Sequence, residues 1–258
     1  MASADRERLI AAHCGEIARC NQRGGRMLSL VDLLTAGTVD LELAGYLCAA
    51  VNAGQSFLVG CVPGGGGKTT VMAALLNVTP ADVVLAPADG LEAIQEAQRN
   101  PSPRQCLICH EIGAGGYYAY LWGEEARAFF ALTRAGHIVA TNLHADTLEQ
   151  CHAQLCGENG VAEEDFTRVG VKVFLHVGGG WGDRARRVAA VHESAPGQAH
   201  RLLFHWQPEK DRFERLAESR LTTPAREAQC REFLGRLAAR KACTIEAVRA
   251  AVLNELGT

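Results

Sequence analysis

The feature that most constrains how this chain folds is a run of four glycines between two apolar segments. The segment before the glycines, SFLVGCV at residues 56–62, is short and bounded by glycine. This pattern is typical of a parallel strand that is buried on both faces. The segment after them, TVMAALL at residues 70–76, predicts a helix. A buried strand, a glycine turn and a helix in this order favour an α/β fold.

Strands and helices alternate along the rest of the chain. Short apolar segments predict further strands at residues 83–86, 106–109 and 137–141. Helical spacing between them predicts helices at residues 91–98 and 124–134. Closely spaced strands follow at residues 170–177, 187–193 and 201–206. We therefore predict a mostly parallel central sheet with an antiparallel extension and a C-terminal helical subdomain.

Composition divides the chain into three parts. We predict a charged helical lead-in at residues 1–26, an α/β domain at 27–206 and the helical subdomain at 207–258. Polar residues typical of helix N-caps mark four helix starts, at Ser29, Asp40, Thr223 and Thr244.

The glycine turn has the chemistry of a phosphate-binding loop. Glycines let the backbone curl so that its N–H groups converge on phosphate oxygens, and the positive end of the following helix faces the same point. Lys68 would reach the β- and γ-phosphates of a nucleotide, and the Thr69 hydroxyl would bind Mg²⁺. The predicted nucleotide-binding residues are Pro63, Gly64, Gly65, Gly66, Gly67, Lys68, Thr69 and Thr70. The strict motif has glycine where this chain has Val62, so an ordinary glycine-rich turn is the alternative.

Further segments occur in the order typical of one family. They are CLICHEI, GEEARAFFALTRAGHIVATNLHADT, LLFHWQPEKDRFERL and a long helical C-terminal segment. With the phosphate loop, they resemble the ATPase superfamily that powers type II and type IV secretion, type IV pili and the archaeal flagellum. The archaeal and tight-adherence branches are the most similar. The resemblance implies a RecA-like P-loop NTPase, ATP and Mg²⁺ as ligands, and a homo-oligomer, a hexamer, that acts on an inner-membrane secretion or pilus platform protein.

The resemblance also assigns roles to three residues. Glu111 matches the family's Walker B carboxylate, which orients or deprotonates the attacking water, directly or through Mg²⁺. His144 matches the histidine box, which contacts the γ-phosphate and reports its loss. Asp89 is what remains of the family's acidic box. Glu111 and His144 come at the ends of predicted strands, where open α/β sheets bind their ligands.

Several departures favour a second hypothesis. Ala88 stands where the acidic box has a glutamate, and the arginine that normally follows the Walker B glutamate is absent. An aromatic insertion, GAGGYYAYLWG at residues 113–123, follows Glu111. The family's N-terminal domain supplies arginines to the nucleotide, and without such a residue the rate can fall by about 10³ to 10⁵. The alternative is a degenerate ATP-binding subunit or regulator with little turnover, which assembles with a separate N-terminal-domain chain or a full-length motor subunit.

Charge and cysteine use predict the compartment. The N-terminal segment is charged and lacks the apolar core of a signal peptide, and no apolar run approaches the roughly 20 residues that span a bilayer. We therefore expect a cytoplasmic protein, at most peripheral at the inner face of the membrane. The ten scattered cysteines are expected to be reduced thiols.

Four other features of the sequence have competing interpretations. The letters CLICH match a haem-attachment pattern, but haem is not expected because its cysteines lie in a predicted buried strand of a chain without an export signal. Cys151, His152 and Cys156 hint at zinc, although thiols on a helix are the simpler interpretation. The aromatic insertion either stacks on bases or a partner, or packs on its own domain. The basic C-terminal part leaves a nucleic-acid motor as a weaker alternative, and nucleic acid is not expected as a partner.

Overall fold

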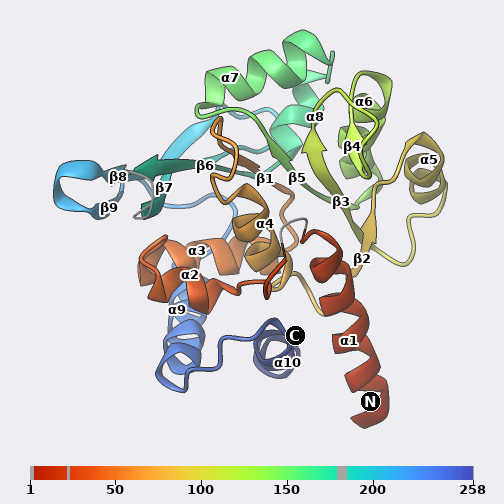
Figure 1. Cartoon of the computed structure of the whole chain (residues 1–258). Helices are drawn as coiled ribbons and strands as arrows, with labels where there is room; N and C mark the ends of the chain where they lie inside the picture. The colour runs from red at the N-terminus through yellow and green to blue at the C-terminus, as the bar shows by residue number, and fades with distance from the viewer. Residues whose placement is uncertain (1–2, 22–23, 179–184, 258) are drawn as a thin grey trace.

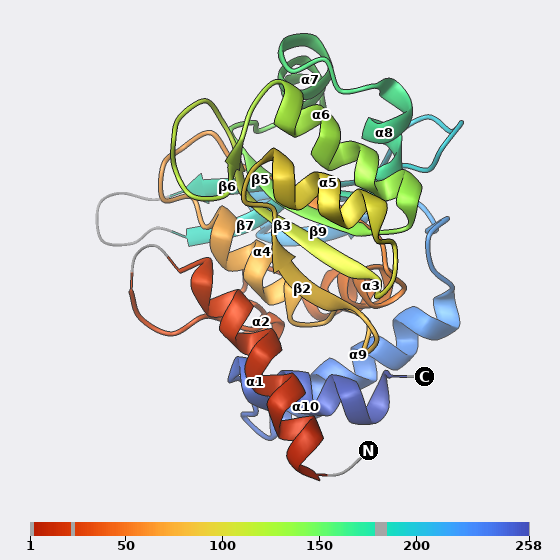
Figure 2. The same ribbon diagram turned by 90° about the vertical axis from the view of Figure 1, so that its right-hand side faces the viewer.

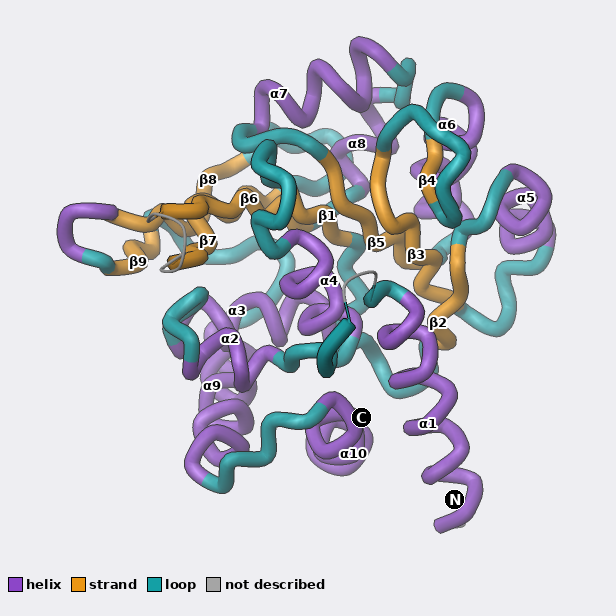
Figure 3. The backbone as a smooth tube through the Cα atoms, in the orientation of Figure 1, coloured by secondary structure: helices purple, strands orange, loops and turns teal. Residues whose placement is uncertain are grey.

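The computed structural model of the chain describes residues 3–21, 24–178 and 185–257. Their strands form one nine-stranded sheet that runs across the middle of the molecule (Figure 3). The strands are β1 (Phe57–Gly60), β2 (Val84–Pro87), β3 (Gln105–Ile112), β4 (Tyr120–Leu121), β5 (Ile138–Leu143), β6 (Val171–Gly178), β7 (Ala185–Glu193), β8 (Arg201–Gln207) and β9 (Arg212–Arg215).

The strand order is β2-β3-β5-β1-β6-β7-β8-β9, and β4 pairs with the end of β3. Strands β2, β3, β5, β1 and β6 are parallel to one another, whereas β7, β8 and β9 continue the sheet from β6 in antiparallel fashion. Every residue of β1 and β5 is buried, as expected for central strands covered on both faces. The predicted mixed α/β sheet is therefore confirmed, and β9 is a strand that the sequence pattern did not predict.

Helices cover both faces of this sheet (Figure 1). One face packs against α1 (Ser3–Arg19), α2 (Leu30–Thr35), α3 (Leu41–Asn52), α4 (Lys68–Leu76), α9 (Pro224–Ala239) and α10 (Ile245–Glu255). The other face packs against α5 (Leu91–Arg99), α6 (Glu124–Ala131), the 3-10 turn η1 (Leu132–Ala135), α7 (Leu148–His152), the π-helical turn η2 (Ala153–Glu158) and α8 (Glu163–Arg168). A second 3-10 turn, η3 (Pro208–Lys210), joins β8 to β9.

Helix starts follow the predicted capping residues. Ser29, Asp40, Thr223 and Thr244 each accept a hydrogen bond from the backbone N–H three residues further on. A search of the described helices finds none with both the length and the apolar character needed to cross a membrane.

The two ends of the chain pack together below the sheet (Figure 2). Arg6 in α1 donates a hydrogen bond to the carbonyl of Ala250 in α10 at 2.7 Å. Helix α9 lies so close to α3 that a Cβ on Gly45 would be 2.3 Å from Cγ of Arg231. Both terminal segments thus share one core with α3 and α4. The boundaries after residues 26 and 206 stay predictions.

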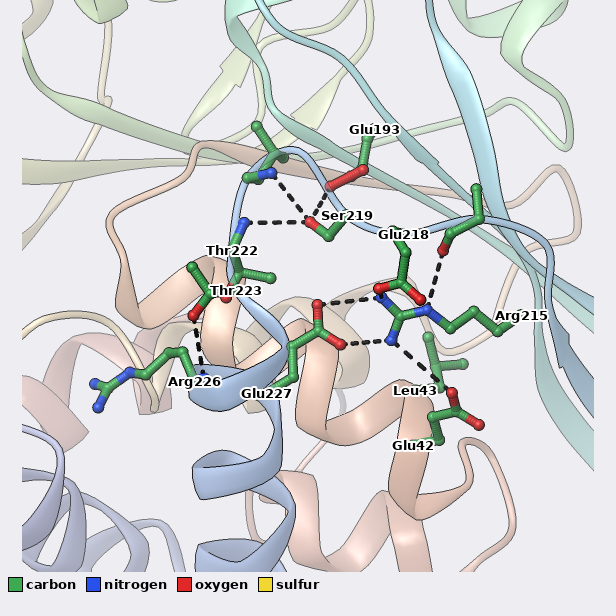
Figure 4. A network of polar contacts seen from close by, with 12 residues as sticks. Glu42, Leu43, Glu193, Arg215, Glu218, Ser219, Thr222, Thr223, Arg226 and Glu227 are labelled. Carbon is green, nitrogen blue, oxygen red and sulfur yellow. Dashed lines mark hydrogen bonds and ion pairs between the residues drawn. The ribbon is translucent and has the colours of Figure 1, made fainter.

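A buried polar network ties the antiparallel strands to α9 (Figure 4). Arg215, at the end of β9, forms an ion pair with Glu227 of α9 at 2.5 Å, and Glu227 is almost fully buried. The same guanidinium lies 3.3 Å from Glu218 and 3.8 Å from Glu42 of α3. Helix α9 is therefore held to the sheet by charge as well as by apolar packing.

Candidate functional site

The glycine turn between β1 and α4 leaves its backbone available to an anion. Gly65 and Gly67 have φ values of +78° and +97°, which favour glycine. Gly66 has no room for a side chain, because a Cβ there would lie 2.3 Å from Sγ of Cys61. Gly67 is the N-cap of α4, and no side chain caps this helix. The first N–H groups of α4 therefore face the loop, which is the arrangement that binds phosphate groups.

Three of the predicted site residues meet beside this loop. Lys68 Nζ lies 3.1 Å from Glu111 Oε1 and 3.3 Å from Nδ1 of His144, and His144 Nε2 lies 3.3 Å from the same Glu111 oxygen. Lys68 and Glu111 are buried, whereas the His144 side chain is 53% exposed. Glu111 lies near the end of β3 and His144 directly follows β5. The parallel order β3-β5-β1 brings these strand ends to the loop after β1.

The hydrogen-bonding options of His144 link it to Lys68. A lysine ammonium only donates, so its contact with Nδ1 requires the lone pair of that nitrogen. The proton then resides on Nε2, which points at Glu111. Nδ1 also lies 3.1 Å from the carbonyl oxygen of Val62, to which it can donate only when it is protonated. The partner of Nδ1 therefore depends on where Lys68 lies.

Mg²⁺ fits the oxygen donors at this site. Glu111 Oε1 is buried and, within the described part of the chain, accepts no well-aligned hydrogen bond. Its neighbours are two cationic or proton-donating groups, Lys68 and His144. Thr69 is half-buried in the first turn of α4. A carboxylate and a hydroxyl are ligands that Mg²⁺ accepts, with water and phosphate oxygens completing its shell.

Asp89 is not part of this cluster. It follows β2, an edge strand that β3 and β5 separate from β1. No hydrogen bond or ion pair among the described residues joins it to Lys68, Glu111 or His144. Asp89 is exposed and instead raises the pKa of His110, which burial lowers by more. Ala88, at the place of the family's glutamate, lies in the apolar core.

Two residues at the loop were missed by sequence reasoning. Arg186 of β7 donates a hydrogen bond to the Gly65 carbonyl at 3.2 Å, and its Cδ lies 2.9 Å from where a Cβ of Gly67 would be. It belongs to no motif and reaches the loop because β6 pairs with both β1 and β7. Asp146 accepts a hydrogen bond from the Val62 N–H at 2.7 Å and fixes the start of the loop. Its position two residues after His144 was the available signal.

The aromatic insertion packs partly on its own domain. Residues 120–121 form β4 and pair with Glu111 and Ile112, which lengthens β3 beyond the predicted strand. The Tyr118 ring meets His110 edge-on, with centroids 5.4 Å apart. Tyr117 is 71% exposed although it contacts Tyr120. Packing thus accounts for part of the insertion, while the side chains of Tyr117 and Tyr118 remain exposed.

Comparison with known proteins gives distant similarities. No model of a known protein family matches the chain. An uncharacterized protein of Methanocaldococcus jannaschii is 26% identical over 214 residues, which cover 72% of this chain and 38% of that protein. The VirB11 ATPase of the Brucella suis type IV secretion system, solved with sulphate, is 22% identical, with a TM-score of 0.45, over 64% of this chain and 54% of VirB11. The Legionella pneumophila ATPase DotB is 12% identical, with a TM-score of 0.44, over 91% of this chain and 64% of DotB.

Both solved structures are ATPases, and VirB11 belongs to a type IV secretion system. The chain spans less than two thirds of each of these three proteins. TM-scores below 0.5 say nothing about single residues, so the roles of Lys68, Glu111 and His144 depend on the geometry of the site.

Proposed function

We propose that this chain binds MgATP at residues 63–70 and hydrolyses it as the motor of a secretion or type IV pilus-like machine. The observation that carries the proposal is the meeting of Lys68, Glu111 and His144 at the mouth of the glycine loop. A cation, a buried carboxylate and an imidazole beside a free helix N-terminus can bind a triphosphate and position water.

In this proposal Lys68 changes partner when the nucleotide binds. Lys68 neutralises Glu111 in the structure. When its ammonium turns to the β- and γ-phosphates, the Glu111 carboxylate is left to hold Mg²⁺ together with the Thr69 hydroxyl and to orient a water molecule. Bound Mg²⁺ would neutralise charge on the phosphate oxygens. The water oxygen then bonds to the γ-phosphorus, its proton passes to Glu111, and the bond from the γ-phosphorus to the bridging oxygen breaks.

His144 and Arg186 act around this step. His144 faces both Lys68 and Glu111, so its hydrogen bonds change when Lys68 moves, and it can report whether the γ-phosphate is present. Arg186 lies over Gly65 and Gly67 and is exposed, so its guanidinium is free to turn toward phosphate oxygens. It supplies from this chain a positive charge of the kind that stabilises a phosphoryl transition state.

The second candidate function is that of an ATP-binding subunit or regulator with little turnover. Two observations favour it: Ala88 is buried in the apolar core, and Asp89 lies away from the cluster. In either case we propose a homo-oligomer, a hexamer, at the cytoplasmic face of an inner-membrane platform protein. A separate N-terminal-domain chain or full-length motor subunit would join it in the second case.

Phosphate release, measured while the protein is sized with and without MgATP, separates these functions. The motor proposal expects assembly with MgATP and turnover that rises with assembly and is lost in Glu111→Gln. Tight binding without turnover in every assembly state would overturn the motor proposal in favour of the regulator. Lys210→Ala is a matched control, because it removes an exposed lysine in η3, outside the site.

A further inference from the structure

A second group of potential ligands lies on the helices that follow the His144 segment. His152 is the last residue of α7, Cys156 lies in the π-helical turn η2, and Glu163 is the first residue of α8. One ligand atom from each, the imidazole nitrogen, the thiol sulfur and a carboxylate oxygen, lies within 4.8 Å of both others. The sequence hint of zinc at Cys151, His152 and Cys156 did not include Glu163. In the structure, His152 and Cys156 of that set lie together, and the third group beside them is the Glu163 carboxylate.

Backbone hydrogen bonds hold this arrangement in place. His152 and Cys156 are four residues apart in one continuous helical stretch, so both side chains lie on the same face. The chain then reverses at Gly160, whose φ is +69°. Across the reversal, the N–H of Val161 donates to the carbonyl of Leu155 at 3.0 Å. Glu163 is thereby returned to His152, and its Oε1 lies 2.5 Å from the imidazole Nε2.

The surroundings of the three side chains favour a ligand over a simple ion pair. The Phe166 ring meets the His152 ring edge-on, with centroids 5.5 Å apart. Cys156 is half-buried and faces the Glu163 carboxylate. A carboxylate does not stabilise the thiolate form of a neighbouring cysteine. A divalent metal ion between the two groups stabilises both as anions.

We propose that His152, Cys156 and Glu163 form a binding site for Zn²⁺. Nitrogen, thiolate and carboxylate oxygen are the ligands that Zn²⁺ takes, and the thiolate disfavours Mg²⁺ and Ca²⁺. Zinc–ligand bonds of about 2.0–2.3 Å place tetrahedral ligand atoms about 3.3–3.8 Å apart. Ligand atoms up to 4.8 Å apart must therefore approach by about 1 Å, and His152 Nε2 and Glu163 Oε1, now 2.5 Å apart, must separate by about 1 Å. Both changes need only side-chain rotation. The 46% and 65% exposure of the His152 and Glu163 side chains permits it. Water would occupy the fourth position.

Zinc here would stiffen the turn that supports the nucleotide cluster. Gln154, between His152 and Cys156, donates to the carbonyl of Ile112 at 3.0 Å, next to Glu111 on β3. Gln150 of α7 accepts a hydrogen bond from the N–H of Asp146 at 2.7 Å. Zinc at this site would therefore affect the nucleotide cluster only through these contacts, and its binding requires no nucleotide.

Metal titration of chelator-treated full-length protein tests the site without ATP. We expect calorimetry to show one equivalent of Zn²⁺ bound per chain and a higher Tm. Co²⁺ should give the intense near-ultraviolet absorption of a thiolate ligand. Cys156→Ser should lose this absorption, and Glu163→Gln should bind Zn²⁺ more than about 10-fold more weakly. Cys243→Ser, which removes a half-buried thiol outside the cluster, should bind like wild type.

Two results would overturn the site. One is folded wild-type protein that binds no stoichiometric Zn²⁺. The other is unchanged Zn²⁺ affinity in both Cys156→Ser and Glu163→Gln. Circular dichroism of the variants shows whether they are folded, and Glu163→Gln alters an exposed side chain that the fold does not need. Because no nucleotide is present, these results are independent of the proposed ATPase function.

Discussion

The phosphate-loop cluster and the proposed zinc cluster are assembled in different ways. Lys68 and Glu111 are buried and are placed by parallel strands whose ends meet at one edge of the sheet. His152 and Glu163 are exposed and meet through one tight reversal of the chain. Strand order thus fixes the first cluster within a rigid core, whereas local hydrogen bonds fix the second. We expect changes at the first to alter chemistry and changes at the second to alter metal affinity and local stability.

The largest effect should come from Glu111→Gln. The substitution keeps the size of the side chain but removes the proposed base, and such groups contribute about 10² to 10⁴ to a rate. We expect phosphate release to fall by about 10³, far more than the loss of MgATP affinity that follows from the missing Mg²⁺ ligand. Equal turnover in Glu111→Gln and wild type would show that the buried carboxylate has no part in the chemistry.

Glu227→Gln separates burial from function. This residue is as buried as Glu111 but lies in the network of Figure 4, away from the loop. The substitution removes the buried charge that pairs with Arg215, whose remaining carboxylate partners Glu42 and Glu218 are exposed. We expect a cost of about 3 kcal/mol in the free energy of unfolding. Urea unfolding measures this cost, and MgATP affinity should be unchanged. A loss of MgATP affinity in Glu227→Gln with no change in the free energy of unfolding would contradict a purely structural role for this residue.

Arg186→Ala tests an exposed residue at the buried site. If its guanidinium turns to the phosphates, MgATP affinity should fall about tenfold, or about 1.4 kcal/mol. Arg212→Ala, which removes an exposed arginine from β9, is the matched control. If neither substitution changes the MgATP affinity, Arg186 does not contact the nucleotide, and its role is limited to the hydrogen bond with Gly65.

The effect of His13 is the smallest at neutral pH, and it grows as the pH falls. Burial, with the charge of Arg249, lowers the pKa of His13 from 6.5 to about 3, although its hydrogen bond to Leu76 acts in the opposite direction. Below pH 6.5 His13 binds a proton in the unfolded chain but stays neutral in the folded chain. Stability is therefore lost as pH falls from about 6.5 toward 3, by up to about 1.4 kcal/mol per pH unit. His13→Gln should flatten the dependence of unfolding free energy on pH over this range.

The sequence predicted the parts of the fold that follow from local pattern. The strand before the glycines, the helix after them and the capping residues Ser29, Asp40, Thr223 and Thr244 all lie as predicted. The mixed sheet also follows from pattern, because buried parallel strands are continuously apolar and the later strands alternate with turns.

Other features depend on contacts that pattern does not contain. The edge position of β2 places Asp89 away from Lys68, and pairing of β6 with β1 and β7 brings Arg186 to the loop. The strand β4, which pairs with β3, lies in a glycine-rich insertion whose sequence pattern is typical of a loop. Glu163 meets His152 only through the reversal at Gly160. Sequence pattern does not contain these contacts, because sheet order and chain reversal are tertiary properties.

Calorimetric titration of MgATP into wild type and Lys68→Ala tests the central claim most directly. Lysine supplies charge-assisted hydrogen bonds of about 1.5–3 kcal/mol each, so its loss should weaken binding by about 100-fold or more. Lys210→Ala should bind like wild type. Folded wild-type protein that gives no heat with MgATP, or Lys68→Ala that binds as tightly as wild type, would contradict nucleotide binding at this loop.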